Sequence, residues 1–168
     1  IYDERSAITA PNSSGTGGTG SLRFFDPEQR PQKIIANKNS FPHWWSNNFY
    51  QFIDHEKKLP FDSHFAKALI APRALINTHA RHDFWANPYG TYLTWLAALP
   101  VFTWLGAGEF NAIHWRDGTH NQDIEDWLAL FDFCDFIFYR KNTGRSFNEN
   151  PYPQKYIFDG LIDYSFPN

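Results

Sequence analysis

The order of the predicted elements constrains this chain more than any other feature. Extended runs rich in β-branched and apolar residues alternate with helical patterns. The predicted strands cover residues 5–10, 73–78 and 112–115, the predicted helices cover residues 63–70, 88–99 and 124–138, and a further short extended run covers residues 101–105. Strands that alternate with helices favour parallel pairing through right-handed crossover connections. We therefore expect an α/β fold.

Start and stop signals set most of the predicted helix boundaries. Asp62 is a good N-cap for the first helix, which has to end before Pro72 because the residue preceding a proline avoids the helical region. Asn87 followed by Pro88 combines a cap with a proline at the first helical position. In residues 124–138, apolar side chains recur at three- and four-residue steps behind an acidic first turn. We expect this last helix to lie against the sheet.

Two segments leave more than one interpretation open. Residues 12–20 contain four glycines among Ser and Thr, which suits a flexible linker or a tight loop whose backbone approaches a site. Phosphate binding is a weaker third interpretation, because the G-x-x-x-x-G-K-[ST] pattern is absent. Residues 41–52 are dense in Trp, Phe and Tyr, and such a segment either packs over a core or lines a cleft.

The remaining segments show little periodicity. Residues 23–40 are predicted to be irregular, apart from a short helix over residues 32–36. We divide the chain into a partial α/β domain, residues 1–140, and a polar, proline-bearing surface tail, residues 141–168, without regular structure. The whole sequence has 168 residues, which suits one domain but is short for a large α/β sheet.

Composition excludes several classes of function. The net charge of −3 provides no basic surface for nucleic acid, and no apolar run approaches the roughly 20 residues that cross a bilayer. The single cysteine, Cys134, rules out a disulfide within the chain. The 17 Phe, 8 Tyr and 7 Trp can fill a core or stack on sugar rings, and composition alone does not choose between these roles.

A carboxylate and a histidine follow two successive predicted strands. Asp83 lies in the loop after residues 73–78, and His120 lies just after residues 112–115. An acid and then a histidine is the order in which an α/β-hydrolase presents its orienting carboxylate and its general base. The G-x-S-x-G motif of a hydrolase nucleophile is absent from the sequence. We predict that Asp83 and His120 meet at one edge of a parallel sheet.

Other roles compete for the same residues. Asp117 is a second candidate for the acid, and Asp83 could instead only cap a helix. His120 could be a loop histidine with no chemical role. His114 lies inside a predicted strand, where a hydrogen-bonded core residue is the better interpretation.

His79 and His82 flank Asp83, which raises the question of a metal site. Three nearby ligands without a second cluster are a weak signal, so we predict no metal and no cofactor. Trp85 could contact a ligand, or it could pack under the helix that begins at Pro88.

Five segments resemble motifs of one known family. Residues 59–75, LPFDSHFAKALIAPRAL, resemble the LPFDxH…ALIAPRxL segment of the glucuronoyl esterases, carbohydrate esterase family fifteen. Residues 5–18 resemble the family's R-x-A-[LI]-T-x-P-x-x-S-G-x-G-G stretch, and Arg23 lies where that stretch continues to a W-R or L-R pair. Residues 44–49 resemble W-F-x-x-N-F, and residues 83–88 resemble D-x-W-A-[DN]-P. Residues 114–127 resemble H-x-R-x-G-x-H with its following D-W. These matches cover most of residues 3–140 in the family's order, and the tail from Lys141 is not covered.

The resemblance implies a serine hydrolase. Family members cleave the ester between a 4-O-methylglucuronic acid of glucuronoxylan and an alcohol of lignin. His120 matches the family's catalytic histidine, and Trp85 matches the tryptophan that contacts the uronate. Ser13 stands where the usual triad acid is found, and Asp83 occupies the alternative acid position of some bacterial members.

The resemblance also implies that part of the catalytic domain is elsewhere. On the family's spacing, the nucleophilic serine lies about ten residues before Ile1, in a G-C-S-R-x-G-K-G motif. We therefore expect the C-terminal half of a three-layer α/β-hydrolase sandwich, with the serine on an upstream segment or a partner chain, in a secreted or periplasmic protein. A half-sheet would leave the edge of the strand at residues 5–10 exposed. Two alternatives remain. The chain could be a carbohydrate-binding relic without catalysis, or it could be a structural subunit that a partner chain completes.

Overall fold

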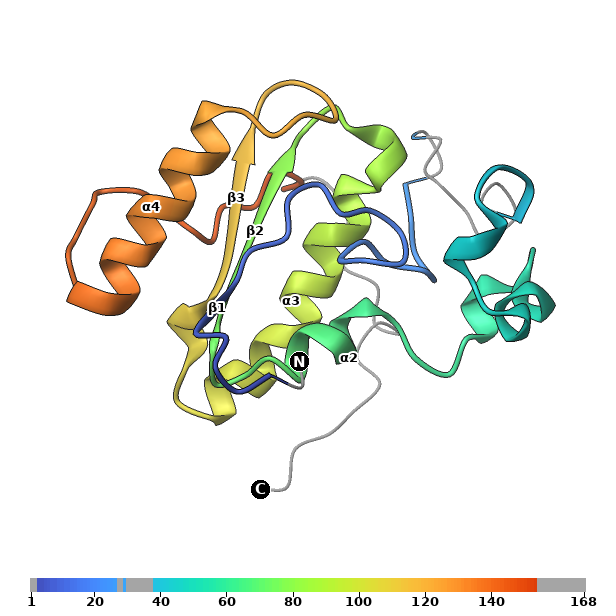
Figure 1. Ribbon diagram of the computed structural model, residues 1–168, viewed down its shortest axis with the longest axis horizontal. Helices are drawn as coiled ribbons and strands as arrows, with labels where there is room; N and C mark the ends of the chain where they lie inside the picture. Colours follow the sequence, from blue (N-terminus) through green and yellow to red (C-terminus); the bar gives the residue numbers. More distant parts are fainter. Residues whose placement is uncertain (1–2, 27–28, 30–37, 154–168) are drawn as a thin grey trace.

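The fold is built on a small parallel sheet (Figure 1). The computed structural model describes residues 3–26, 29 and 38–153. Within these residues the sheet has three strands in the order β1-β2-β3, and both pairs are parallel. The strands are β1 (Ile8–Thr9), β2 (Ala74–Ala80) and β3 (Asn111–Arg116). The expected α/β class with parallel strands is confirmed.

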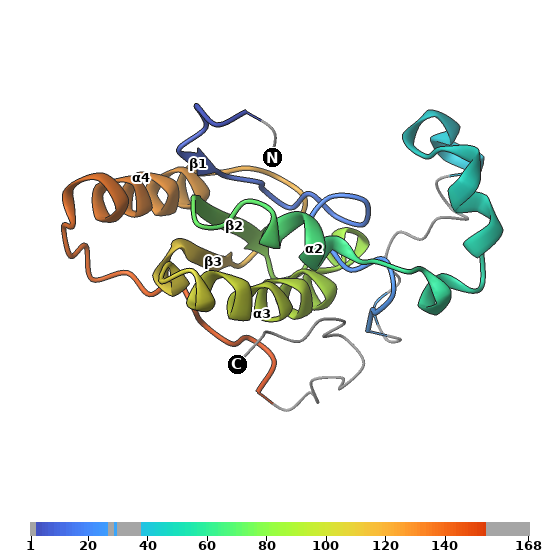
Figure 2. The same cartoon turned by 90° about the horizontal axis from the view of Figure 1, so that it is seen from below.

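Helices cover both faces of the sheet. The α-helices whose whole length is described are α2 (Ser63–Ala68), α3 (Pro88–Trp104) and α4 (Ile124–Tyr139). Short 3₁₀ helices are η1 (Pro42–Trp44), η2 (Asn47–Phe52), η3 (Glu56–Lys58), η4 (Phe84–Ala86) and η5 (Gly108–Phe110). Figure 2 shows α4 on one side of the strands and α3 on the other, so the described residues form three layers.

The alternation of side chains along β2 divides the core between the two faces. Leu75 packs with Ala98 and Phe102 of α3, whereas its neighbour Ile76 packs with Phe133 of α4. All of these side chains are buried. Successive residues of a strand point to opposite faces, so a run of buried apolar residues fits a strand that is covered on both sides.

The predicted helix caps are present. The carboxylate of Asp62 accepts a hydrogen bond from the backbone N–H of Ser63 at 2.7 Å, at the start of α2. Asn87 Oδ1 accepts one from the backbone N–H of Gly90 at 2.9 Å, with Pro88 at the first position of α3. Each cap satisfies a donor that the first helical turn cannot pair internally.

The prediction of an extended run over residues 101–105 is wrong. Helix α3 continues through Pro100 and ends at Trp104. A proline inside a helix removes one backbone hydrogen bond and costs about 3 kcal/mol. Here the continued helix places Phe102, which is fully buried, against Leu75 and Ala98. Packing on the sheet therefore outweighs the local signal to stop.

Strand lengths also differ from the prediction. The first strand is limited to Ile8–Thr9, which pair with Ala74 and Leu75, rather than extending over residues 5–10. The two other strands are slightly longer than predicted, because β2 and β3 pair with each other from Leu75–Asn111 to Ala80–Arg116. The length of pairing between strands decides these boundaries, and no local pattern records it.

The glycine-rich segment forms a tight loop. The backbone N–H groups of Gly18 and Gly20 both donate to the carbonyl oxygen of Gly15, at 3.0 and 2.8 Å. A Cβ on Gly20 would lie 3.2 Å from the carbonyl oxygen of Ala86, in the turn that carries Trp85. This tight approach favours glycine and brings the loop next to the predicted site.

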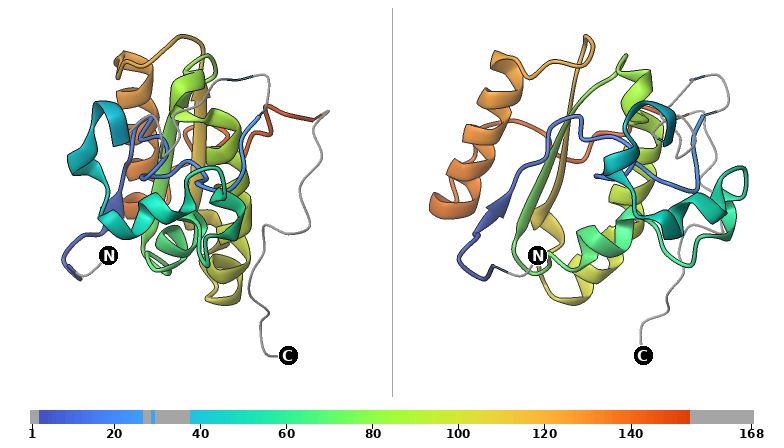
Figure 3. Two further views of the ribbon diagram at one scale, coloured as in Figure 1. Left: turned by 90° about the vertical axis from the view of Figure 1, so that its right-hand side faces the viewer. Right: turned by 45° about the vertical axis from the view of Figure 1, so that its right-hand side comes forward.

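The aromatic segment at residues 41–52 lies apart from the sheet, as Figure 3 shows. Four of its rings, those of Trp45, Phe49, Tyr50 and Phe52, pack around Leu22 and Leu59 as a small separate cluster, whereas Trp44 is 49% exposed. Residues 140–153 have no helix or ladder strand, and Asn148 forms an isolated bridge with Ile113 of β3. The predicted helix at residues 32–36 lies outside the described residues. In the described ranges, helix length and apolarity fall short of what a membrane crossing requires.

Candidate active site

Asp83 and His120 lie at the carboxyl ends of neighbouring strands. Ala80 pairs with Arg116 at the last position of the β2–β3 ladder, and the chain reaches Asp83 and His120 a few residues later. Backbone contacts continue past the ladder, because the N–H of His82 donates to the carbonyl oxygen of Gly118 at 3.2 Å. The two loops are therefore held together at the edge of the sheet.

The two predicted side chains are hydrogen-bonded to each other. His120 Nδ1–H donates to Asp83 Oδ2 at 2.7 Å. The Asp83 side chain is only 3% exposed, whereas the His120 ring is 60% exposed. A buried carboxylate that accepts from Nδ1 fixes the orientation and the tautomer of the imidazole, and it leaves Nε2 to exchange a proton with a substrate or a nucleophile.

Trp85 lies beside this pair. Its ring meets the ring of His120 edge to face, with centroids 5.9 Å apart and planes at 86°, and it is 40% exposed. The turn that carries it is held by Asn87, which has a left-handed backbone and whose Nδ2 donates to the carbonyl oxygens of Ser21 and Phe24 at 3.0 Å each. Trp85 therefore leaves part of its side chain exposed near the histidine.

The competing interpretations of the acid do not fit the geometry. Asp117 is 87% exposed at its side chain, and its Oδ1 lies 3.7 Å from Arg81 Nε. Asp83 precedes the η4 turn, but its carboxylate makes no capping hydrogen bond there. Ser13, at the family's usual acid position, is a buried loop residue whose N–H donates to the carbonyl oxygen of Thr78 at 2.9 Å.

The remaining histidines do not join the pair. His79 is fully buried, its Nδ1 lies 3.0 Å from the carbonyl oxygen of Ala80, and burial lowers its pKa below the usual value. His114 is buried in β3 with Nε2 3.4 Å from Glu125 Oε1, and burial lowers its pKa as well. His82 contacts the ring of Phe84. In the part of the chain that the structure describes, His, Cys, Asp and Glu do not gather in a group that could hold a metal ion.

Arg116 is a residue of the site that the sequence did not single out. Its guanidinium donates to the carbonyl oxygen of Asp117 at 3.0 Å, to that of Thr119 at 3.2 Å and to that of Asn121. These carbonyls lie on both sides of His120, so the guanidinium holds the histidine loop from inside. An arginine at the end of a strand, followed by an acidic helix start, is the signal that could have found it.

Together, the fold and the pair define a class of protein. A parallel sheet between helices, with a buried acid after one strand and a histidine after the next, is the C-terminal half of an α/β-hydrolase. A family model described as "Glucuronyl esterase, fungi" matches residues 1–106. The chain belongs to the glucuronoyl esterase family.

Relatives support this assignment along nearly the whole chain. The chain is 35% identical over 149 residues to the carbohydrate esterase MZ0003 of an unknown prokaryotic organism, covering 79% of this chain and 33% of that protein. It is 31% identical over 169 residues to the 4-O-methyl-glucuronoyl methylesterase of Phanerochaete carnosa, covering 96% of this chain and 40% of that protein.

Solved structures agree with this. A family fifteen glucuronoyl esterase from Caldicellulosiruptor kristjansonii superposes with a TM-score of 0.86 at 29% identity, over 99% of this chain and 45% of that chain. A promiscuous family fifteen esterase from a marine bacterial metagenome superposes with a TM-score of 0.72 at 32% identity, over 82% of this chain and 37% of that chain. The chain therefore spans less than half the length of each of these relatives.

Proposed function

We propose that this chain supplies the histidine and the acid of a serine esterase that cleaves the ester between 4-O-methylglucuronic acid of glucuronoxylan and lignin alcohols. The hydrogen bond between His120 Nδ1 and Asp83 Oδ2, at 2.7 Å, is the observation that carries the proposal. Family membership supports the ester chemistry, and the relative from Phanerochaete carnosa is described as a 4-O-methyl-glucuronoyl methylesterase.

In the proposed mechanism, His120 acts as the general base. Its Nε2 takes the proton of a serine from an upstream segment or a partner chain, and the alkoxide attacks the carbonyl carbon of the uronate ester. The imidazolium then gives this proton to the departing alcohol, and water hydrolyses the acyl-enzyme by the same steps. Asp83 keeps the imidazole oriented and stabilises its positive charge.

Trp85 is the proposed contact for the sugar. Its partly exposed ring, beside His120, offers an apolar face of the kind that packs against a pyranose. We propose the same role for it as for the matching tryptophan of the family, and a secreted or periplasmic location for the whole enzyme.

The serine and the substrate can be tested together. The full-length protein is assayed on methyl and benzyl esters of glucuronic acid, beside this 168-residue chain alone and beside full-length His120→Ala. We expect activity only in the full-length protein with His120 intact. Full activity of His120→Ala would overturn the assignment of the base.

Two alternatives have different outcomes. The intact mass of the native protein exceeds 19.6 kDa if upstream sequence is present in the same chain. A native species of this mass without esterase activity, even when mixed with a separately expressed upstream half, would favour the carbohydrate-binding relic. Activity that appears only on mixing would favour a partner chain, which we expect to pair with the free edge of β1.

A further inference from the structure

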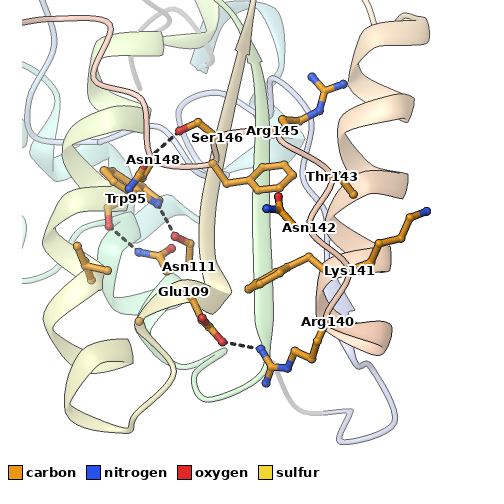
Figure 4. A pocket seen from close by; sticks show the side chains of 14 residues that line it. Trp95, Glu109, Asn111, Arg140, Lys141, Asn142, Thr143, Arg145, Ser146 and Asn148 are labelled. Carbon is orange, nitrogen blue, oxygen red and sulfur yellow. Dashed lines mark hydrogen bonds and ion pairs between the residues drawn. The ribbon is translucent and has the colours of Figure 1, made fainter.

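A cavity whose lining includes neither Asp83 nor His120 lies at the outer edge of β3. It has a volume of about 500 Å³ and lies between α3, α4 and the segment that follows α4, as Figure 4 shows. Asn111, at the first position of β3, is one of its lining residues, whereas His120 follows the opposite end of the same strand. This volume is within the range of roughly 300–1000 Å³ that is usual for small-ligand sites.

Half-buried apolar side chains form part of the wall. Leu99 comes from α3, Phe136 from α4, and Phe147 from the segment that hydrogen-bonds to β3, where the carbonyl oxygen of Phe147 accepts from Ile113 at 2.7 Å. Phe147 is held in place by the ring of the buried Phe133, 5.2 Å away. Phe147 thus offers fixed apolar surface to a ligand, whereas the ring of Phe136 lies under the guanidinium of Arg140, 5.6 Å from its centroid.

The charges of the wall are already paired. Arg140 donates to Glu109 Oε1 at 2.5 Å, and both residues line the cavity. The other two cations of the wall, Lys141 and Arg145, bind carboxylates of α4, at 2.5 Å to Asp135 and 2.8 Å to Asp132. A ligand with its own net charge would therefore find no unpaired opposite charge among the described residues of the wall.

Neutral polar groups make up most of the remaining lining. They are the side chains of Asn111, Asn142, Thr143, Ser146 and Asn148. The oxygen of Asn142 accepts from the N–H of Gly144 at 2.9 Å, and that of Asn148 contacts the hydroxyl of Ser146 at 2.9 Å. Among the described residues, the amide N–H₂ groups of Asn142 and Asn148 keep their donors for a ligand.

We propose that this cavity is a second, non-catalytic site for a short neutral oligosaccharide. Amides, hydroxyls and aromatic rings without unpaired charge match a pyranose, which presents hydroxyl groups at its edge and C–H groups on its faces. Such a site would hold a polysaccharide while the ester is cleaved elsewhere, and its existence does not depend on the proposed catalytic function.

The indole of Trp95 provides a local probe. Trp95 lines the cavity, and its Nε1–H donates to the carbonyl oxygen of Asn111 at 2.9 Å. The indole N–H peak in a ¹H–¹⁵N NMR spectrum therefore reports on this wall. ¹⁵N-labelled chain is titrated with xylotetraose, with a tetrasaccharide that carries glucuronate, and with benzyl alcohol. We expect a saturable shift of the Trp95 signal with xylotetraose and no tighter binding of the charged sugar.

Variants separate this site from the catalytic pair. Thr143→Trp places a large side chain in the cavity. The double variant Asn142→Ala, Asn148→Ala removes two hydrogen-bond donors and serves as a second test if Thr143→Trp does not fold. Each variant should raise the Kd for xylotetraose at least about tenfold. Asn47→Ala, on the exposed surface of η2, and His120→Ala should leave the affinity unchanged.

Several outcomes overturn the proposal. These are the absence of a saturable shift with xylotetraose, equal affinity in the cavity-filling and control variants, and preference for benzyl alcohol or for the charged sugar. Loss of binding in His120→Ala would place the sugar at the catalytic pair instead. None of these results decides the esterase assay, because that assay measures catalysis at Asp83 and His120 and not binding in this cavity.

Discussion

Arg116 Nε donates to Asp126 Oδ2 at 2.6 Å, joining the end of β3 to the first turn of α4. Both side chains are almost completely buried, at 2% and 0% exposure. Asp126 also accepts from the backbone N–H of Asp123 and completes the capping box of α4. Asp126 is therefore the nearer of two carboxylates that compensate the buried guanidinium, because Asp123 Oδ2 lies 3.3 Å from Arg116 Nη1.

Asp126→Ala should destabilise the fold strongly. It removes the nearer of the two carboxylates that face the buried guanidinium of Arg116, while Asp123 Oδ2 stays 3.3 Å from Nη1. Breaking a buried pair typically costs about 3–5 kcal/mol, and because Asp123 remains we expect a loss of about 3 kcal/mol. Urea unfolding at pH 7 measures the loss. The control Glu149→Ala breaks the surface pair with Arg81, 2.8 Å long, and should cost less than about 1 kcal/mol. Equal losses in the two variants would show that the buried pair has no special weight.

Asp83→Asn should remove most of the esterase activity of the full-length protein. An amide can present its N–H₂ to Nδ1 and favour the wrong imidazole tautomer, so kcat should fall about 10³- to 10⁴-fold with little change in Tm. Asp117→Asn, an exposed carboxylate that faces Arg81, serves as the matched control and should keep normal kcat. In the 168-residue chain, ¹⁵N NMR should show His120 protonated at Nδ1. A predominantly Nε2-protonated ring in that spectrum would contradict the geometry.

The stability of the chain should fall as the pH drops below about 6.5. Burial lowers the pKa of His79, and burial followed by the charge of Arg145 lowers that of His114. Below the ordinary histidine pKa, these histidines bind protons in the unfolded chain but stay neutral in the folded chain. The free energy of unfolding therefore falls as the pH drops from the ordinary pKa to the lowered pKa values of the folded chain. Unfolding free energies at pH 5, 6 and 7 test this. His79→Gln should reduce the slope, and an unchanged slope in both His79→Gln and His114→Gln would refute the assignment.

Lys67→Met should stabilise the fold. Lys67 is fully buried between α2 and α3, and burial holds its pKa well below the ordinary value, with only partial compensation from Asp62. Its Nζ donates to the carbonyl oxygen of Thr91 at 3.1 Å and to Thr94 Oγ1 at 2.9 Å. Methionine fills similar volume without the cost of a buried amine, so the free energy of unfolding at pH 7 should rise by on the order of 1 kcal/mol.

The pH dependence distinguishes this explanation from a simple packing effect. Because the folded pKa of Lys67 is lowered, the unfolded chain binds the extra proton, and stability rises with pH up to the ordinary lysine value. Lys67→Met should remove this rise, whereas Lys57→Met, in the exposed turn η3, should keep it. A loss of stability in Lys67→Met at pH 7 would mean that its two hydrogen bonds outweigh the cost of burial.

Local patterns predicted the helices and strands well where the signal is local. The caps at Asp62 and Asn87 lie where the residue types place them, because a cap depends only on the next three residues. The pairing of Asp83 with His120 could also be predicted, since the carboxyl ends of parallel strands meet at one edge. The end of α3 could not be predicted in this way. The helix is longer than the local pattern indicates because its last turn buries Phe102 against Leu75, which is distant in the chain.

The sequence by itself determined the α/β class, the helix starts, the family resemblance and the histidine of the pair, with Asp83 and Asp117 both left as candidates for the acid. Only the tertiary structure decided that Asp83 rather than Asp117 faces the histidine, that Arg116 holds its loop, that Lys67 is buried and that a cavity opens beside β3. Periodicity and capping act over a few residues, whereas burial and the pairing of charges depend on elements that come together only in the folded chain.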